Sequence, residues 1–244
     1  MSTAVATPLG NSQRDLTFSS SPSVTADDIT MVFCVRLHAG NPWIAARLDM
    51  MALYYDPCPR IVVVDFGSQP DDAQIIRDIC QRHGYQYKFV DDFGLFSLSK
   101  ARNIGASLCS SEFIFFCDPD FISERDIFKR LGDAASALNM RATIDVLLNP
   151  PAFHLAEAET RLFEKAADPE QKSKLIKKFS FTLFYAETSR ENERYVAPYS
   201  NVFLINRRFF SLIGGYDTSF RGHGSEDFEF LLRYCIHAGL LPMP

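Results

Sequence analysis

The sequence predicts an α/β fold: a doubly wound, Rossmann-like, mostly parallel sheet with helices on both faces. Over the first 150 residues, apolar runs of strand length alternate with segments whose apolar residues have helical spacing. The strand-like runs are apolar on both faces over most of their length, as in TMVFCVRL at 30–37 and EFIFFC at 112–117. Parallel strands covered by helices on both faces have this composition, because neither side of the strand meets water.

Five strands and four helices are expected in this first half. The strands are predicted at 30–37, 60–65, 85–90, 112–117 and 143–148. The helices are predicted at 43–55, 71–83, 98–109 and 123–137. Turn and capping residues support three of the helix ends: Asn41-Pro42 before the first, Gly84 after the second, and Ser123 as N-cap of the fourth.

The second half has a different pattern. A charged helical stretch is predicted at 152–178, followed by a strand at 179–185, a polar loop at 187–194, a strand at 199–206 and a short helix at 207–213. A final helix is predicted at 225–238, with Ser225 as N-cap and two acids in its first turn. Residues 1–28 lack apolar periodicity and are expected to form a disordered leader.

Composition excludes several classes of protein. The 244 residues are 47% hydrophobic and 23% charged, with a net charge of −5, and no basic stripe indicates a nucleic-acid partner. The six cysteines form no CxxC pair, which favours reduced thiols in the core. Since no apolar run of about 20 residues and no signal peptide are found, the protein is expected to be cytoplasmic.

Three carboxylates follow predicted strands. Asp65 ends the second strand, and Asp118 and Asp120 come directly after the fourth. Ligands of doubly wound sheets bind at the carboxyl ends of the strands. Asp118 and Asp120 would repel each other unless a cation lies between them, and Mg²⁺ and Mn²⁺ favour such oxygen ligands. Taken alone, Asp-Pro-Asp is equally compatible with an exposed turn.

A second group of acids lies at the start of the final helix. Gly222 to Asp227 (GHGSED) combines glycines, which let a ligand approach the backbone, with the acids Glu226 and Asp227. An acid there can accept a proton from a hydroxyl nucleophile. The alternative is an ordinary helix N-terminus with favourable acids.

Basic residues form the third group. Lys100 and Arg102 enter a helix at SLSKARN (97–103), and a helix N-terminus with such residues can hold anions. A solvated basic turn is the alternative. Arg36, at the end of the first strand, is a further candidate.

In this order, the segments resemble a family 2 glycosyltransferase of the GT-A fold. The likeness is closest to the bacterial capsule-biosynthesis branch, with a galactosyltransferase-like C-terminal motif, and it extends over about residues 30–240. The motifs V-V-D-x-G-S, A-R-N-x-G, D-x-D and G-G-(Y/F)-D-x-x-F-x-G-x-G-x-E-D are matched by Val63–Ser68, Ala101–Gly105, Asp118–Asp120 and Gly214–Asp227.

The resemblance implies a role for each of these residues. Asp118 and Asp120 would hold Mn²⁺ or Mg²⁺ against the donor diphosphate, with Asp120 the more direct ligand. Asp227 would be the general base, and Glu226 would bind the acceptor sugar. Asp65 would contact the nucleobase or ribose, and Arg102 would help to anchor the nucleotide. The nucleotide-binding set is completed by Arg36, Ser68 and Lys100.

The implied activity is inverting, metal-dependent transfer from a nucleotide-sugar, by default a UDP-sugar, to a glycan or lipid-linked glycan in surface polysaccharide synthesis. Residues 29–150 would bind the nucleotide and 151–244 the acceptor, with contact to the inner membrane or to assembly proteins left open. One alternative is a noncatalytic sugar-nucleotide or glycan-binding module of a larger polymerase. A nucleotidyltransferase is less favoured, because residues 37–41 (LHAGN) are not rich in glycine.

Three features depart from the family pattern. Phe66 replaces a second acid that often follows Asp65, and His223 replaces a common tryptophan. A late histidine ligand for the metal is not found, and His237 is poorly placed for that role. We therefore expect a site completed by the diphosphate or by sequence beyond Pro244.

Overall fold

The computed structural model describes residues 22–150, 152–153, 155–166, 168–182, 196–197, 202–222 and 224–242. The predicted loop at 187–194 and His223 lie outside the described residues. Six strands form the main sheet: β1 (Ile29–Val35), β2 (Arg60–Phe66), β3 (Gln86–Val90), β4 (Phe113–Cys117), β5 (Leu147–Leu148) and β8 (Phe203–Asn206). Two short strands, β6 (Ala152–Phe153) and β7 (Val196–Ala197), pair separately.

The main sheet has the order β3-β2-β1-β4-β8-β5. The first four strands in the chain are mutually parallel, while β8 runs antiparallel to both β4 and β5. The predicted α/β, mostly parallel, doubly wound class is therefore confirmed. Because β8 lies between β4 and β5, the two halves of the chain share one sheet.

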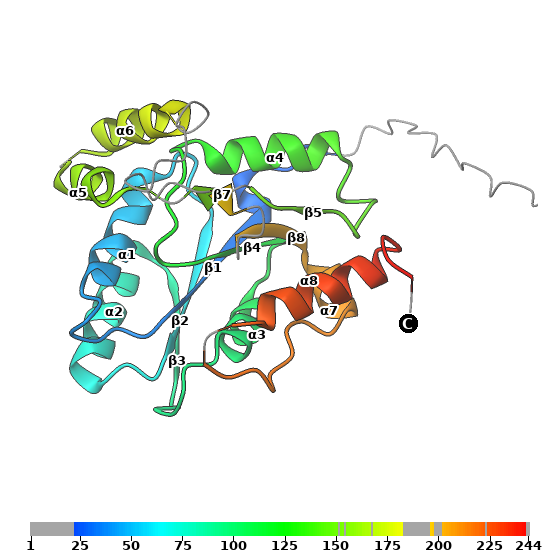
Figure 1. Cartoon of the computed structure of the whole chain (residues 1–244), viewed down its shortest axis with the longest axis horizontal. Coiled ribbons are helices and arrows are strands. Elements are labelled where there is room, and N and C mark those ends of the chain that lie inside the picture. Colours follow the sequence, from blue (N-terminus) through cyan, green and yellow to red (C-terminus); the bar gives the residue numbers. More distant parts are fainter. Residues whose placement is uncertain are drawn as a thin grey trace, which may run out of the picture.

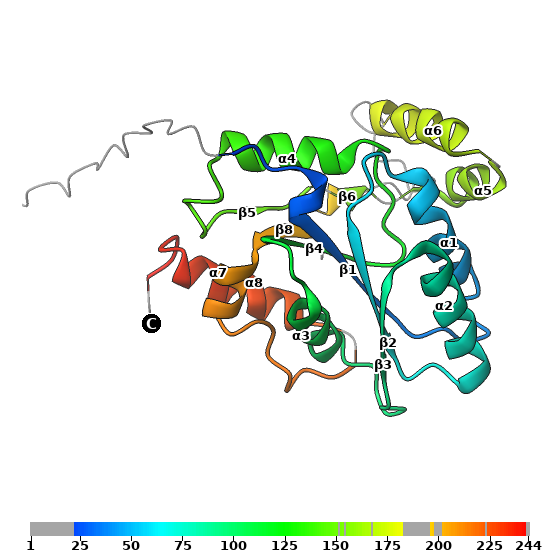
Figure 2. The ribbon, with the colours of Figure 1, turned by 180° about the vertical axis from the view of Figure 1, so that it is seen from behind.

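Helices cover both faces of this sheet (Figures 1 and 2). The helices are α1 (Trp43–Tyr54), α2 (Pro70–His83), α3 (Leu98–Leu108), α4 (Ile127–Ala137), α5 (Glu157–Lys165), α6 (Pro169–Thr182), α7 (Arg207–Leu212) and α8 (Glu226–His237). Successive residues of β1 point to opposite faces: Met31 and Phe33 pack with α1, α2 and α4, whereas Val32 and Cys34 pack with α3, α7 and α8. Two buried layers on one strand explain its unbroken apolar sequence.

The α5–α6 hairpin adds a small cluster outside these layers. Phe163, Ile176 and Phe179 are buried together and pack against Met50 of α1. Figure 1 shows the pair of helices at one end of the molecule, beside α1.

The chain reverses its direction of travel across the sheet between β1 and β4. From β1 it proceeds through β2 to β3, and it then returns to place β4 on the other side of β1. The carboxyl ends of β1 and β4 therefore flank a crevice at the topological switch point, where doubly wound proteins bind ligands.

Glycine sets how closely α3 approaches the sheet. A Cβ added to Gly105 would lie 2.3 Å from Cγ1 of Val32 and 3.3 Å from Cγ2 of Val64. Only glycine permits this packing, so the A-R-N-x-G glycine brings α3 against the two strands that lead to the crevice.

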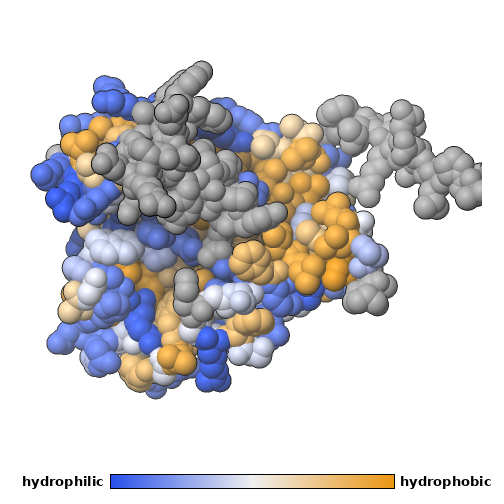
Figure 3. Space-filling model, viewed as in Figure 1, coloured by the Kyte–Doolittle hydropathy of each residue, from blue (hydrophilic) through white to orange (hydrophobic). Residues whose placement is uncertain are grey.

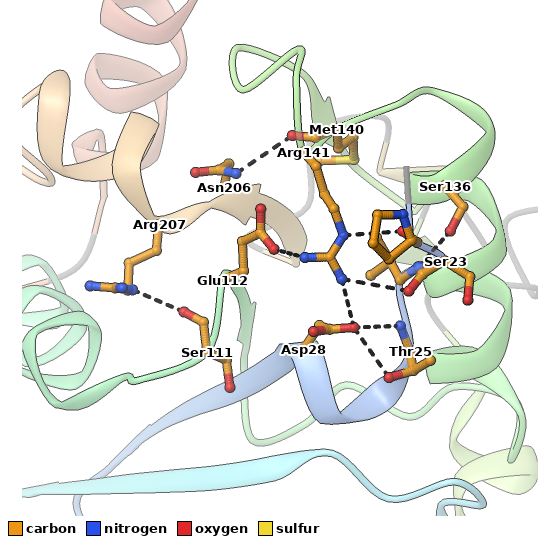
Figure 4. A network of polar contacts seen from close by, with 12 residues as sticks. Ser23, Thr25, Asp28, Ser111, Glu112, Ser136, Met140, Arg141, Asn206 and Arg207 are labelled. Carbon is orange, nitrogen blue, oxygen red and sulfur yellow. Dashed lines mark hydrogen bonds and ion pairs between the residues drawn. The ribbon is translucent and has the colours of Figure 1, made fainter. Parts of the chain in front are cut away.

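Residues 22–28, predicted to belong to the leader, are part of the packed structure. Val24 and Ala26 are buried, and a short 3₁₀ helix occupies Ala26–Asp28. Figure 4 shows Arg141 joining Asp28 to Glu112, and the Val24 amide donates to Ser136 Oγ at 2.7 Å. The prediction was wrong here because these anchors come from distant residues; positions 1–21 lie outside the described part of the chain.

Two other boundaries were wrong in the first half. α4 begins at Ile127 and not at Ser123, whose carbonyl instead accepts a hydrogen bond from the buried Tyr54 hydroxyl at 2.8 Å. Of the strand predicted at 143–148, only Leu147–Leu148 forms a strand, paired with β8, because the preceding residues form turns, closed by the hydrogen bond from Val146 N to Thr143 O at 3.3 Å.

Two predictions for the second half need correction. Phe179–Thr182, predicted to begin a strand, continues helix α6, and the rest of that predicted strand lies outside the described residues. The final helix spans Glu226–His237, within the predicted 225–238. Ser225 occupies the N-cap position at φ +71°, however, and its side chain makes no capping hydrogen bond.

Apolar surface gathers on one side of the molecule. Figure 3 shows it most clearly near the ends of α4 and α8, where the exposed side chains include Leu138, Leu240 and Leu241. Within the described ranges, no helix has both the length and the apolar character needed to cross a bilayer.

Candidate active site

A cavity of about 810 Å³ opens at the carboxyl ends of β1 and β4. Its polar wall contains Arg36, Asp118, Asp120, Glu226 and Asp227. Its apolar wall includes Trp43, Ile44, Phe203, Phe228 and Leu231. The two predicted groups of acids, more than a hundred residues apart in the chain, therefore face one space.

Asp118 and Asp120 enter this cavity from the turn after β4. The carbonyl of Asp118 accepts the Phe121 amide at 3.1 Å, which closes the turn around Pro119. Both acids line the cavity, and two carboxylates with open space before them suit Mg²⁺ or Mn²⁺. Among the described residues no cluster of three or more His, Cys, Asp or Glu could hold a metal.

Arg102 contacts one acid from each of the two groups. Its side chain, on α3, is almost entirely buried. Nη2 lies 2.7 Å from Asp118 Oδ1, and Nη1 lies 2.6 Å from Asp227 Oδ1. Nη1 also donates to the Tyr216 hydroxyl at 2.9 Å. The structure therefore brings three of the predicted residues into one ion-pair network.

The charges in this network act on one another. Burial raises the pKa of Asp227 above its ordinary value, Arg102 opposes the rise, and the charges of Glu226 and Asp118 add to it. Burial alone would lower the pKa of Arg102, but Tyr216, Asp118 and Asp227 outweigh this, so its pKa stays well above the ordinary value. The guanidinium is therefore a permanent cation, and Asp227 holds protons more strongly than an exposed aspartate.

The segment that carries Glu226 and Asp227 is tied to α3. Gly222 N donates to Phe96 O at 2.9 Å, and Ser97 Oγ donates to Phe220 O at 3.1 Å. Ser97 also accepts the Lys100 amide and so caps α3. These bonds place the start of α8 beside the start of α3, and Glu226 is buried at the cavity wall.

Asp65 and Ser68 lie deeper than the sequence suggested. Asp65 is fully buried, and its carboxylate accepts from the Tyr87 hydroxyl at 2.9 Å and the Ser68 amide at 3.1 Å. Ser68 Oγ accepts the Leu37 amide at 2.8 Å. Neither residue is part of the cavity wall. Their hydrogen bonds, to Leu37 and Tyr87 and to each other, connect β1, β2 and β3. A direct contact with the nucleotide stays a prediction.

Arg36 and Lys100 lie at the edge of the site. The Arg36 guanidinium donates to the carbonyls of Phe66, Asp92 and Gly94 at 2.5, 2.8 and 2.7 Å. It lines the cavity while three of its five N–H donors are engaged by these carbonyls. Lys100 is half-exposed, lies 3.2 Å from Asp92 Oδ2, and is not part of the wall.

Three further residues were given no role from the sequence. Tyr216 lines the cavity and receives the Arg102 hydrogen bond, and Asn103 holds the Tyr216 backbone. Trp43, the single tryptophan, lines the cavity and is 37% exposed. The sequence could have indicated Tyr216 and Asn103, because both lie inside matched motifs. No local pattern around Trp43 indicates that it lines the cavity.

The order and direction of the strands are those of a GT-A type of protein. The chain belongs to the glycosyltransferase-like family 2, whose family model matches residues 30–244. A search of curated proteins found no match.

Similar solved structures include a Pyrobaculum calidifontis mannosyltransferase in complex with GDP-Man and Mn²⁺, at 14% identity and a TM-score of 0.51. The similarity covers 90% of this chain and 56% of that one, and it supports the fold alone. Residues 1–349 of S. aureus TarS match at 15% identity and a TM-score of 0.49, over 84% of this chain and 54% of that chain. The chain thus spans just over half the length of these structures.

Proposed function

We propose that this protein is an inverting glycosyltransferase, which moves a sugar from a nucleotide-sugar to an acceptor hydroxyl. The observation that carries the proposal is the single cavity shared by Asp118, Asp120, Glu226 and Asp227. One pair of acids suits a donor diphosphate with its cation, and the other suits the acceptor. Transfer requires both halves of the reaction in one space, and family membership is in accord with this arrangement.

On the donor side, Asp118 and Asp120 are the residues that would hold Mn²⁺ or Mg²⁺. Their carboxylates fit a site that the donor's own phosphates complete, and Asp120 is the more exposed of the two. When bound, the cation neutralises charge that develops on the leaving diphosphate. A Mn²⁺ ion and a nucleotide-sugar together in the mannosyltransferase complex support including both in the assay.

On the acceptor side, Asp227 is the proposed general base. The acceptor hydroxyl gives its proton to the Asp227 carboxylate as its oxygen attacks the anomeric carbon from the face opposite the leaving diphosphate. The bond to the diphosphate breaks as the new glycosidic bond forms, so a single displacement inverts the anomeric centre. Glu226, at the cavity wall, would orient the acceptor sugar, and the apolar wall with Trp43 and Phe228 would exclude water from the reacting atoms.

The donor nucleotide and the acceptor class are part of the proposal. UDP-sugars are the first candidates by family resemblance, and GDP-sugars the second. The acceptor is proposed to be a glycan or lipid-linked glycan of a surface polysaccharide, with residues 151–244 contributing to its binding. The nucleotide side would be shaped by Arg36 and Lys100 at the edge of the site. Asp65 and Ser68 would contribute through the strands that they connect.

A donor panel tests this function directly. UDP-, GDP- and CMP-sugars are incubated with Mn²⁺ or with EDTA, and thermal shift and donor hydrolysis are both measured. We expect one nucleotide class to raise the melting temperature only with the cation and to be hydrolysed slowly without acceptor. Binding with neither hydrolysis nor transfer to any glycan would favour the noncatalytic module, and no binding of any nucleotide-sugar would refute both.

A further inference from the structure

We propose that Arg102 is a positioning residue that fixes the cation-binding acid Asp118 and the base Asp227 relative to each other through one shared guanidinium. The proposal rests on the proposed function, in which these acids serve opposite halves of the reaction. This role differs from the help in anchoring the nucleotide that the family resemblance implied for Arg102. Arg102 does not line the cavity, so it acts on the reaction through the two acids.

The geometry is that of a bridge. Two different nitrogens of one rigid, planar group contact two carboxylates, at 2.7 Å to Asp118 and 2.6 Å to Asp227. These partners are 16 and 125 residues away in the chain, on the end of β4 and the start of α8. Because the nitrogens are fixed with respect to each other, the two carboxylates are held at a set separation, which a flexible ammonium could not do.

The bridge is itself held in place. The guanidinium lies 5.2 Å from the ring centroid of Tyr216 and 6.0 Å from that of Phe116. Tyr216 accepts a hydrogen bond from Arg102, and its backbone is held by the neighbouring Asn103. The close contact of Gly105 with β1 and β2 fixes the height of α3 above the sheet. Because these contacts restrain Arg102, the guanidinium can set the positions of Asp118 and Asp227 and does not move to follow them.

The charge of Arg102 is as important as its shape. Among the described residues, four carboxylates line the cavity: Asp118, Asp120, Glu226 and Asp227. Arg102 is a buried cation that contacts two of them, Asp118 and Asp227. Because the residue is only 1% exposed, water cannot reach these carboxylates in its place. Its removal would leave like charges facing one another across the site, which favours separation of the two halves.

Arg233 provides a matched control. It is an arginine on α8 that pairs with Glu229 at 2.7 Å and donates to the carbonyls of Ile213 and Gly215. It supports the same segment as Tyr216 without contacting the cavity acids. Loss of Arg233 therefore reports what a purely structural arginine contributes here.

The first experiment compares Arg102→Gln, Arg102→Lys and Arg233→Gln. Transfer is measured at saturating donor and acceptor, and binding of Mn²⁺ with UDP or GDP is measured by calorimetry without acceptor. We expect Arg102→Gln to lower kcat by about 100-fold and the nucleotide–cation affinity by about 10-fold, as misplacement of reacting groups and loss of an outer-shell partner do. Arg102→Lys should recover the affinity better than kcat, since one ammonium can serve one acid at a time.

Arg233→Gln should lower the melting temperature and leave kcat of the folded protein near that of the wild type. If Arg102→Gln behaves in the same way, Arg102 is only structural and the proposal is overturned. The same conclusion follows if Arg102→Lys restores kcat fully.

A double-mutant cycle tests the bridge without any activity. The melting temperatures of Arg102→Gln, Asp227→Asn and the double variant are compared, and likewise for Asp118→Asn. We expect each double variant to lose less than the sum of the single losses, because one interaction is removed twice. Additive losses in both cycles would overturn the bridge. If the cycles show coupling while the wild type binds no nucleotide-sugar, the proposed function has failed and the bridge stands as a structural one.

Discussion

The side-chain amide of Asn103 holds the backbone of Tyr216 at both its polar groups. Oδ1 accepts from Tyr216 N at 2.8 Å, and Nδ2 donates to Tyr216 O at 2.8 Å. Asn103 is therefore one of the links between α3 and the segment that leads to the acids of α8. Asn103 follows Arg102 in the A-R-N-x-G motif. Asn103 makes hydrogen bonds to the backbone of Tyr216, and Arg102 forms an ion pair with Asp227, so both residues connect α3 to the segment that leads into α8.

This link gives a prediction for Asn103→Asp. An aspartate keeps the acceptor but loses the donor, so the Tyr216 carbonyl loses its hydrogen bond and gains a repelling neighbour. We expect a loss of about 1–3 kcal/mol in the free energy of unfolding, measured by urea denaturation. Ser107→Ala, on the exposed side of the same helix, is the control and should change stability by less than about 0.5 kcal/mol. Equal stabilities of the two variants would contradict the link.

The acids of the turn after β4 and the acid of α8 should be separable by experiment. Asp118→Asn combined with Asp120→Asn is expected to abolish both transfer and cation-dependent nucleotide binding, because the cation loses both of its charged protein ligands. Thermal shift with nucleotide and Mn²⁺ measures the binding. Normal turnover by the double variant would show that the metal site lies elsewhere.

Asp227→Asn should retain donor binding and lose transfer. The amide has no proton-accepting carboxylate, and loss of a general base costs about 10²–10⁴-fold in rate. Calorimetry for nucleotide binding and a transfer assay separate the two effects. A transfer rate equal to that of the wild type would remove Asp227 from the mechanism.

The transfer rate should depend on pH in a direction set by Asp227. Its pKa is raised above the ordinary value of 3.8, mainly by burial. A base works in its ionised form, so kcat/KM, which reports the free enzyme, should fall as the pH drops through this raised pKa, and the acid limb should lie above pH 3.8. The limb should be absent from the residual activity of Asp227→Asn; its persistence there would assign it to another group.

Gly105→Ala tests how tightly α3 is packed against the sheet. The added methyl group would overlap Val32 at 2.3 Å, so the helix would have to move. We expect a loss of about 1–3 kcal/mol in the free energy of unfolding, together with reduced transfer, because Arg102 moves with the helix. Gly94→Ala is a suitable control, since its Cβ would meet only the end of the Asp92 side chain at 3.2 Å. An unchanged melting temperature for Gly105→Ala would contradict the close packing.

The sequence alone determined the strands and helices that depend on local pattern. β1, β2 and β4 appear as predominantly apolar runs because both of their faces are covered, and α2 ends where Gly84 adopts the left-handed conformation at φ +71°. The motifs also indicated which acids follow β4 and begin α8. These features are recorded in a few neighbouring residues, so they can be read without knowing the fold.

Only the tertiary structure decided where distant residues meet. Ser123 failed to start α4, and Phe179–Thr182 remained helical, because packing partners elsewhere in the chain outweighed local preference. Likewise, Asp65 could be identified but its complete burial could not. The family resemblance implied that Arg102 helps to anchor the nucleotide; only the tertiary structure shows that it also joins Asp118 to Asp227. That bridge forms because α3, the turn after β4 and the start of α8 pack together. These segments are separated in the chain, so no local sequence pattern records the contact.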